Sequence, residues 1–574
     1  MPAPAPDPSL LNESINGKSY RPTPVRLLLA MYLASVLLHV ALLWRASAFP
    51  FFASDAVQYA LTADNVRLGK GYTLRGHFND SLPPIYPVFV AFADSFTANP
   101  HVPMLVLSSA AMCLAIFPVY KLARLVELRQ REAVLLGAAA AVLPHTFYAG
   151  MYMAETLQYP LFLTAFYLAM AWLATPNQRR AVLLGVVMGV MLLNKVQGIQ
   201  FILPFFVVAA GFVRGRSRQI GIMLFLTAGP YLLWQVYKTA HAAPGFGAYG
   251  RALDSGLPHW TWSLAVSYAA DFLLAPGLVM VVPLFLWMRA NVHTQRTRVF
   301  FVAALLATQL LLVSTLDGGL TGWLRERLFM YCFPITAVLA ARGLGYMSTS
   351  VRQWFVFAGV PIAIAGVLLL YPFQAPIPLE TPWAFALGAG ISKLRLAVLS
   401  IAGIVVFSFL LFRFRRVAAV ILAAGILVFH SATLILVARN MEASVAPAMA
   451  VLQPIKEWLA NEGVVPGSRL LVAGRHNYFE PQHAGCRTDG KLLDWTWRLG
   501  LPESTVWAIE TLGRYDVRMI PGVPEFAAVS KSGDYFLTIA QPLGLEFVSR
   551  HPPYSLYRVP SGVEWDRVTF SYGR

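Results

Sequence analysis

The sequence predicts a polytopic α-helical membrane protein with a small α/β domain after its last span. Of the 574 residues, 57% are hydrophobic and only 13% are charged, which is typical of a protein that lies mostly in a bilayer. Apolar segments long enough to cross a membrane recur between residues 25 and 440. Residues 441–574 have the mixed composition of an ordinary folded domain.

The chain is strongly basic, with 45 Lys and Arg against 28 Asp and Glu and a net charge of +17. In a soluble protein this excess would suggest nucleic acid as a partner. Here the basic residues gather in short loops between apolar segments, as they do in the cytoplasmic flanks of membrane helices. We therefore expect membrane lipids as partners and no nucleic acid.

The basic loops alternate with loops poorer in positive charge, and this alternation predicts about thirteen transmembrane helices in residues 25–440. Residues 1–24 lack the features of a signal peptide and are expected to be a disordered cytoplasmic tail. The protein is then expected in a bacterial-type inner membrane, with its C-terminal domain outside the cytoplasm. The expected spans are 26–47, 101–121, 131–148, 155–175, 180–194, 197–213, 219–238, 262–288, 299–316, 327–343, 353–371, 394–412 and 416–437.

Two of these spans, 180–194 and 197–213, are short, so that they either cross with little tilt or re-enter the membrane. In the C-terminal domain, strands and helices alternate over about 130 residues, which indicates a small extracytoplasmic α/β domain. Strands are expected at 469–473, 517–520, 535–540 and 554–559, and helices at 457–461 and 503–512.

The first external loop, residues 48–100, carries the most informative motifs. They are Ser54-Asp55 followed by Tyr59, then Gly69-Lys70-Gly71-Tyr72, then Pro83-Pro84-Ile85-Tyr86-Pro87. Asp55 lies shortly after the first apolar segment, at the expected membrane boundary. A carboxylate at that boundary can meet a lipid-borne substrate from one side and a water-borne substrate from the other.

Further motifs continue this pattern: Met153-Ala-Glu155 ahead of Pro160, Asn194-Lys195 at a helix end, and Arg325-Glu326-Arg327 ahead of the tenth span. In this order and with this sidedness, the motifs resemble those of the GT-C superfamily of membrane glycosyltransferases, near the protein-mannosyltransferase and lipid A aminoarabinose-transferase branch. The resemblance implies a GT-C-type helix bundle, an acidic catalytic residue in the first external loop and a polyprenyl-phosphate sugar as donor.

The function that this resemblance implies is inverting transfer of a single sugar from the donor to a hydroxyl acceptor, which is a glycan, a lipid or an exported protein. Such a reaction needs a base to take the acceptor proton, and Asp55 is the expected general base. Asp55 could alternatively cap a helix that starts near Ala56. Glu155, at the external end of the fourth span, could orient the acceptor or share a metal, or could simply meet the helix dipole.

Three cations are expected on the external side, where positive residues are under-represented. A forked guanidinium or an ammonium there suits the phosphate of the donor. The alternatives are ordinary contact with lipid headgroups, or neutralisation of Glu326. The expected phosphate-binding residues are Lys195, Arg325 and Arg327.

Aromatic residues and histidines of the external loops are expected to contact the substrate; the tyrosines could instead form an interfacial belt. No pair of the external histidines, which include His241, has the spacing of metal ligands, and the three cysteines have no zinc-type spacing. Many relatives carry two adjacent acidic residues where this chain has Asp55-Ala56, which counts against tight metal binding there. No metal ligand is assigned, and a divalent metal cofactor stays open. The expected substrate-binding residues are Tyr59, Tyr72, Tyr86, His77 and His259.

Two other classes of function compete with an enzyme. A lipid or sugar transporter, or flippase, would favour internal repeats and broken helices around a site in the middle of the membrane. A receptor or assembly platform would use the C-terminal domain. The candidate charges lie at the external rims, with few ionisable residues inside the spans, and this favours an enzyme that works at the interface.

Overall fold

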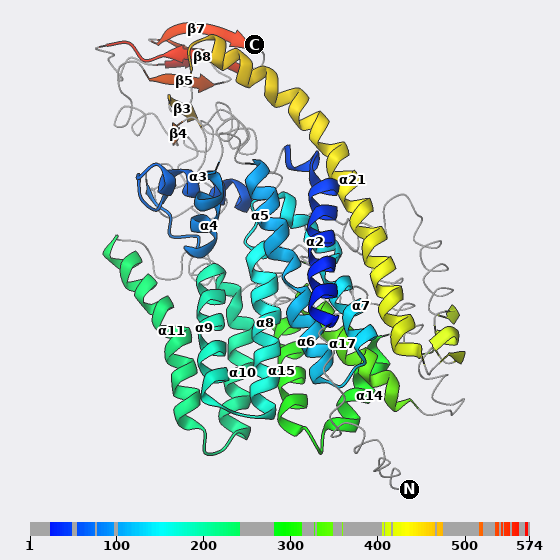
Figure 1. Cartoon of the computed structure of the whole chain (residues 1–574). Helices are drawn as coiled ribbons and strands as arrows, with labels where there is room; N and C mark the ends of the chain where they lie inside the picture. The colour runs from blue at the N-terminus through cyan, green and yellow to red at the C-terminus, as the bar shows by residue number, and fades with distance from the viewer. Residues whose placement is uncertain are drawn as a thin grey trace.

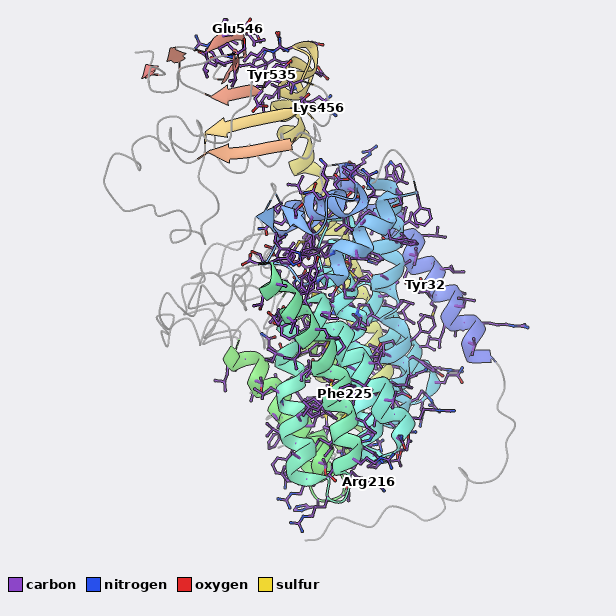
Figure 2. All side chains as sticks on the ribbon, turned by 90° about the vertical axis from the view of Figure 1, so that its left-hand side faces the viewer. Tyr32, Arg216, Phe225, Lys456, Tyr535 and Glu546 are labelled. Atoms are coloured by element: carbon purple, nitrogen blue, oxygen red, sulfur yellow. The ribbon has the colours of Figure 1, made fainter. Side chains whose placement is uncertain are left out.

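The computed structural model describes most of the helical part and scattered strands of the C-terminal part. The described residues are 23–48, 54–74, 77–96, 101–241, 280–312, 327, 330–347, 359, 405–406, 408–411, 413–414, 417–464, 468–473, 516–520, 534–538, 541–543, 545–551, 554–561 and 569–571. Figure 1 shows a bundle of helices with the C-terminal strands beyond one end of it. In Figure 2, Arg216 lies at the opposite end of the bundle from Lys456 and Tyr535.

The first helix, α2 (Thr23–Leu43), lies on the outside of the bundle. Only 17% of its most apolar stretch is buried inside the protein, so most of its apolar side chains are available to lipid. After the short η1 (Ala46–Ala48), the chain forms two helices joined by a small hairpin at the end of the bundle nearer the C-terminal strands (Figure 1). These elements are α3 (Ser54–Arg67), β1 (Thr73–Leu74), β2 (His77–Phe78) and α4 (Ile85–Asp94).

Most of the central helices follow the predicted spans, because their apolar runs are long and bounded by basic or turn-forming residues. They are α5 (His101–Cys113), α6 (Ile116–Leu125), α7 (Gln130–Ala141), η2 (Pro144–Gly150), α8 (Glu155–Ala174), α9 (Gln178–Asn194), η3 (Val196–Gly198), α10 (Ile199–Phe212), α11 (Ser217–Ala240), α14 (Val281–Asn291), α15 (Arg296–Leu312), α17 (Cys332–Gly343) and η7 (Leu344–Tyr346).

Two predicted spans differ from the structure. The span expected at 131–148 is a bent pair, α7 and η2, with an angle of 49° between them. Pro144 explains the break, because the residue before a proline is disfavoured in an α-helix. The span expected from residue 327 begins only at Cys332, so Arg327 precedes helix α17 instead of lying in its first turn.

Helices α9 and α11 pack closely because Gly185 and Gly189 lie one turn apart on α9. A Cβ atom at Gly189 would lie only 2.5 Å from the carbonyl oxygen of Leu226 on α11. Small residues at this spacing allow two membrane helices to approach at the backbone. The contact fixes α9, which ends immediately before Lys195.

Within the described residues, five helices are long and apolar enough to cross a membrane, or six if α7 and η2 form one span. This confirms the predicted polytopic helical class. The count of about thirteen stays a prediction, since the spans expected at 353–371 and 394–412 lie almost entirely outside the described residues. Of the short pair, the second run is Val196–Phe212, one of the shorter apolar helices, and whether it crosses or re-enters the membrane stays a prediction.

The last long helix, α21 (Ala418–Asn461), has 44 residues and leaves the bundle towards the C-terminal strands (Figure 1). The helix expected at 457–461 is the end of α21 and not a separate element. Trp458 Nε1 donates a hydrogen bond of 2.7 Å to Ser549 Oγ, which ties this end of the helix to the strands.

The C-terminal strands form a five-stranded sheet with the order β4-β3-β5-β8-β7. Its first three strands are parallel, whereas β8 is antiparallel to both β5 and β7. All four predicted strands are present, but β7 was not predicted, because it is a polar edge strand whose Phe547 is 57% exposed. The strands are β3 (Arg469–Ala473), β4 (Asp516–Ile520), β5 (Tyr535–Thr538), β7 (Glu546–His551) and β8 (Tyr554–Arg558), with β6 (Gln541–Leu543) and β9 (Thr569–Ser571) as a separate pair.

Candidate active site

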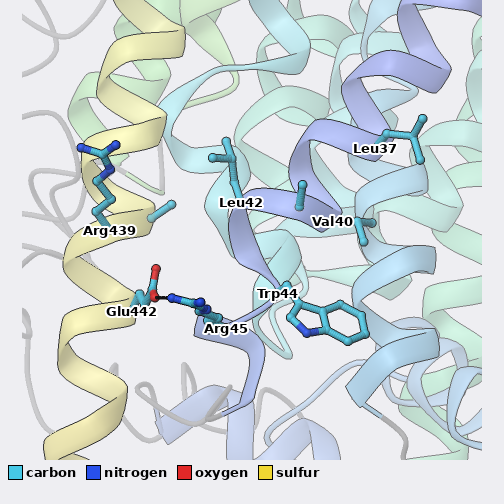
Figure 3. A pocket seen from close by; sticks show the side chains of 9 residues that line it. Leu37, Val40, Leu42, Trp44, Arg45, Arg439 and Glu442 are labelled. Carbon is cyan, nitrogen blue, oxygen red and sulfur yellow. Dashed lines mark hydrogen bonds and ion pairs between the residues drawn. The ribbon is translucent and has the colours of Figure 1, made fainter.

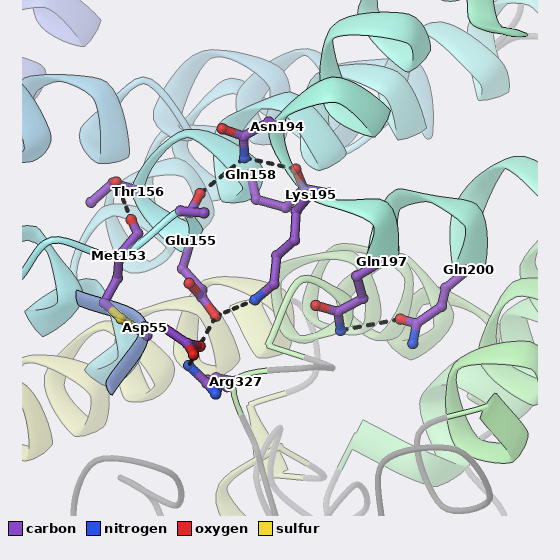
Figure 4. A network of polar contacts seen from close by, with 11 residues as sticks. Asp55, Met153, Glu155, Thr156, Gln158, Asn194, Lys195, Gln197, Gln200 and Arg327 are labelled. Atoms are coloured by element: carbon purple, nitrogen blue, oxygen red, sulfur yellow. Dashed lines mark hydrogen bonds and ion pairs between the residues drawn. The ribbon is translucent and has the colours of Figure 1, made fainter. Parts of the chain in front are cut away.

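Four charged side chains from four separate segments meet, one of them in the first turn of α3, and we call them the four-charge site (Figure 4). Arg327 Nη1 lies 3.2 Å from Asp55 Oδ2 and 3.7 Å from Glu155 Oε1. Lys195 Nζ lies 2.5 Å from the same Glu155 oxygen. The carboxylate of Glu155 therefore sits between two cations, and Arg327 links it to Asp55.

The four side chains differ in exposure. Glu155 is 1% exposed and Arg327 is 5% exposed, whereas Lys195 is 12% and Asp55 is 39% exposed. Two carboxylates and two cations balance each other, which is what a buried cluster requires, because an uncompensated buried charge is costly. Asp55 is the more exposed of the two carboxylates of this site.

Local sequence explains where each charge lies. Asp55 is in the first turn of α3, which begins at Ser54, two residues before the start that the capping alternative expected, and its carboxylate contacts Arg327. Glu155 is the first residue of α8. Both carboxylates therefore lie where a helix dipole favours negative charge. Lys195 follows α9 in an extended conformation, which directs its side chain back towards α8.

Asn194 joins the end of α9, which precedes Lys195, to the start of α8, which carries Glu155. Its Nδ2 donates hydrogen bonds of 3.0 Å to the carbonyl oxygen of Ala154 and to Gln158 Oε1. Asn194 is fully buried, and these bonds join the residue before Lys195 to the residue before Glu155. The register between the end of α9 and the start of α8 is thereby fixed.

No role was predicted for Asn194 from its motif, and three glutamines near the site were not predicted at all. Gln158 accepts from Asn194, and Gln197 Nε2 donates to Gln200 Oε1 at 3.3 Å (Figure 4). All three glutamines are buried. The available signal was the presence of amides inside otherwise apolar membrane segments, where polar groups are costly and tend to be functional.

Two of the predicted substrate-binding tyrosines pack under the site. Tyr59 and Tyr86 are 4% and 0% exposed, and their rings meet edge to face with centroids 4.7 Å apart. Burial raises the pKa of Tyr59 well above its usual value, and the carboxylate of Asp55 raises it further. The phenol of Tyr59 therefore stays protonated and neutral beside Asp55. Contact of either tyrosine with substrate stays a prediction.

Tyr72 connects two parts of the first external loop through hydrogen bonds. Its hydroxyl donates to the carbonyl oxygens of Leu82 and Pro83, both at 3.0 Å, and burial raises its pKa well above the usual value. Its ring meets Trp234 of α11 edge to face at 5.1 Å. Within the described residues these contacts indicate packing of the loop on α11, and a role in substrate binding stays a prediction.

The structure describes only some of the external histidines, and it does not describe Arg325. His241 stacks on Phe78 with centroids 4.9 Å apart. His77 lies in β2, but the described part of the chain does not include its side chain. Arg325 and His259 lie outside the described residues.

The described residues do not form a group of three or more His, Cys, Asp or Glu side chains that could hold a metal ion. Asp55 and Glu155 both contact cations of the protein, and Ala56 follows Asp55 where a second carboxylate would stand. Within the part of the chain that the structure describes, these side chains do not fit a metal site.

The fold of this chain is similar to that of known GT-C glycosyltransferases, as the resemblance in the sequence predicted. A family model described as dolichyl-phosphate-mannose-protein mannosyltransferase matches residues 81–235. The matched stretch includes Glu155 and Lys195 but neither Asp55 nor Arg327. A comparison with curated protein sequences finds no match.

Two crystal structures of ArnT from Cupriavidus metallidurans are similar to this chain along nearly their whole length. The one bound to undecaprenyl phosphate aligns with a TM-score of 0.57 and 13% identity, covering 93% of this chain and 98% of that chain. The apo structure gives a TM-score of 0.56 and 13% identity, covering 92% and 97%. At this identity the likeness shows the fold.

Proposed function

We propose that this protein is a membrane glycosyltransferase that moves a single sugar from a polyprenyl-phosphate donor to a hydroxyl acceptor at the external membrane face. The observation that carries the proposal is the four-charge site, in which an accessible carboxylate and two cations converge at one end of a GT-C bundle. The matched mannosyltransferase family and the undecaprenyl phosphate bound to a similar structure support this choice of donor.

In the proposed reaction Asp55 is the general base. It takes the proton of the acceptor hydroxyl while that oxygen forms a bond to the anomeric carbon. The bond from the anomeric carbon to the phosphate oxygen breaks on the opposite face, so the configuration inverts and polyprenyl phosphate leaves. The exposure of Asp55, 39%, leaves room for the acceptor beside it.

Lys195 and Arg327 are the proposed partners of the donor phosphate, on which negative charge grows as the bond breaks. Glu155 holds both cations in place and is a positioning residue in this scheme. We infer that the phosphate competes with Asp55 for Arg327. Because a contact with a guanidinium weakens a carboxylate as a base, donor binding would strengthen Asp55 as a base at the moment it is needed.

The test is a lipid extract of the purified protein followed by a transfer assay. We expect a polyprenyl-phosphate species to co-purify with the wild type and to be lost from a Lys195→Ala/Arg327→Ala variant. A matched control is Arg342→Ala, which removes another arginine–carboxylate contact, the 2.8 Å pair of Arg342 with Glu127. The proposal is wrong if the wild type retains no such lipid, or if the double variant retains as much of it.

A further inference from the structure

A groove of about 580 Å³ runs between α2 and α21 and shares no residue with the four-charge site (Figure 3). Leu37 and Trp44 on its α2 side are 69% and 53% exposed. Since α2 is a membrane-length helix, we expect Leu37 to face lipid tails, whereas Trp44 lies just after the end of the helix. The apolar wall consists of Leu37, Val40, Ala41, Leu42, Trp44 and Ala438.

Charged residues close one end of the groove. Arg45, directly after α2 and Trp44, is 79% exposed and lies 2.8 Å from Glu442 of α21. Arg439 is exposed and lies one turn before Glu442 on the same helix. Two arginines against one carboxylate leave an excess of one positive charge beside a tryptophan, at the ends of two candidate spans.

We propose that this groove binds one anionic phospholipid from the leaflet at this end of the bundle. The headgroup phosphate would lie between Arg45 and Arg439, because a guanidinium matches a phosphate with two parallel hydrogen bonds. An acyl chain would lie along Leu37 and Ala41. A zwitterionic lipid would satisfy the apolar wall equally well but would leave the positive excess uncompensated, so the charge favours an anionic headgroup.

The test measures lipid binding to the full chain by native mass spectrometry, with phosphatidylglycerol or phosphatidylcholine added. Phosphatidylglycerol should bind more tightly than phosphatidylcholine. Each arginine that is lost should lower the affinity for phosphatidylglycerol about fivefold, so the preference should vanish in Arg45→Gln/Arg439→Gln. The matched control is Arg67→Gln, since Arg67 also pairs with a carboxylate, Asp64, at 3.1 Å but lies outside the groove. That variant should keep the wild-type preference.

Two further variants keep the proposal falsifiable if the double variant fails to fold. Arg45→Lys/Arg439→Lys should retain most of the preference, since it keeps the charge, and Ala41→Trp should reduce the binding of both lipids by filling the groove. Equal affinity of the wild type for the two lipids would overturn the proposal. So would a dimer that Ala41→Trp dissociates, because the groove would then be an interface between two copies.

Discussion

Arg327 and Arg45 each contact a carboxylate of a distant segment of this molecule, in opposite environments. Arg327 is 5% exposed and lies 3.2 Å from Asp55 and 3.7 Å from Glu155. Arg45 is 79% exposed and lies 2.8 Å from Glu442. The exposed pair therefore has the shorter distance, although the buried one belongs to the candidate active site.

We expect burial, and not distance, to decide what such a contact does. An exposed pair is screened by water and salt, and contributes little to stability. A buried pair has a strong interaction but a high desolvation cost, so removing one partner leaves an uncompensated charge. The buried cluster can therefore hold charges ready for a reaction, while the exposed arginine can exchange its partner for a ligand.

The largest expected effect is on turnover in Asp55→Asn. The change removes a proton acceptor but keeps the shape of the side chain, so turnover should fall about a hundredfold to ten-thousandfold while the protein still folds. Transfer of labelled sugar measures this. Asp64→Asn is the matched control, since Asp64 lies on the same helix and also pairs with an arginine. Near-normal turnover in Asp55→Asn would place the base elsewhere, with Glu155 as the next candidate.

Glu155→Gln tests the comparison itself. Loss of the buried carboxylate leaves Lys195 and Arg327 without their shared partner, and should lower the free energy of unfolding by about 3–5 kcal/mol. Glu442→Gln removes the carboxylate of the exposed pair and should have no measurable effect. Unfolding in detergent, followed by circular dichroism, measures both. Equal losses would contradict the argument from burial.

Asn194→Ala should have a smaller effect. It leaves the carbonyl oxygen of Ala154 and Gln158 Oε1 without this donor in a buried place, at a cost of about 1–3 kcal/mol. Because Asn194 fixes the register of Lys195 against Glu155, the KM for the donor should also rise. Gln453→Ala, which breaks an exposed contact with Glu457, is the control and should change neither quantity. A loss of stability with an unchanged KM would limit Asn194 to a structural role.

Arg327→Lys should have the smallest effect of the four. The change keeps the charge but loses the planar fork, so one hydrogen bond to the donor phosphate is lost and KM for the donor rises about tenfold. Arg342→Lys makes the same change in an exposed pair and should leave KM unaltered. If both variants behave alike in steady-state kinetics, Arg327 does not hold the phosphate.

The sequence alone determined the class of protein and the course of the chain. Hydropathy and basic loops are local signals, and they placed α8, α9 and α11 within a few residues of their observed ends. They also placed Asn194-Lys195 at a helix end, whereas the helix start near Asp55 was only the alternative reading of that residue as a cap. The local pattern did not predict the bend between α7 and η2 at a single proline, and it did not predict the polar edge strand β7.

Only the tertiary structure decided which candidate charges meet. Asp55 and Arg327 are 272 residues apart, and Glu155 and Lys195 are 40 apart, so no local pattern pairs them. The pairing depends on how the helices pack, for example on Gly189 allowing α9 to approach α11. The same packing leaves Asp55 accessible and buries Glu155, because whether a side chain is exposed depends on the neighbours that cover it.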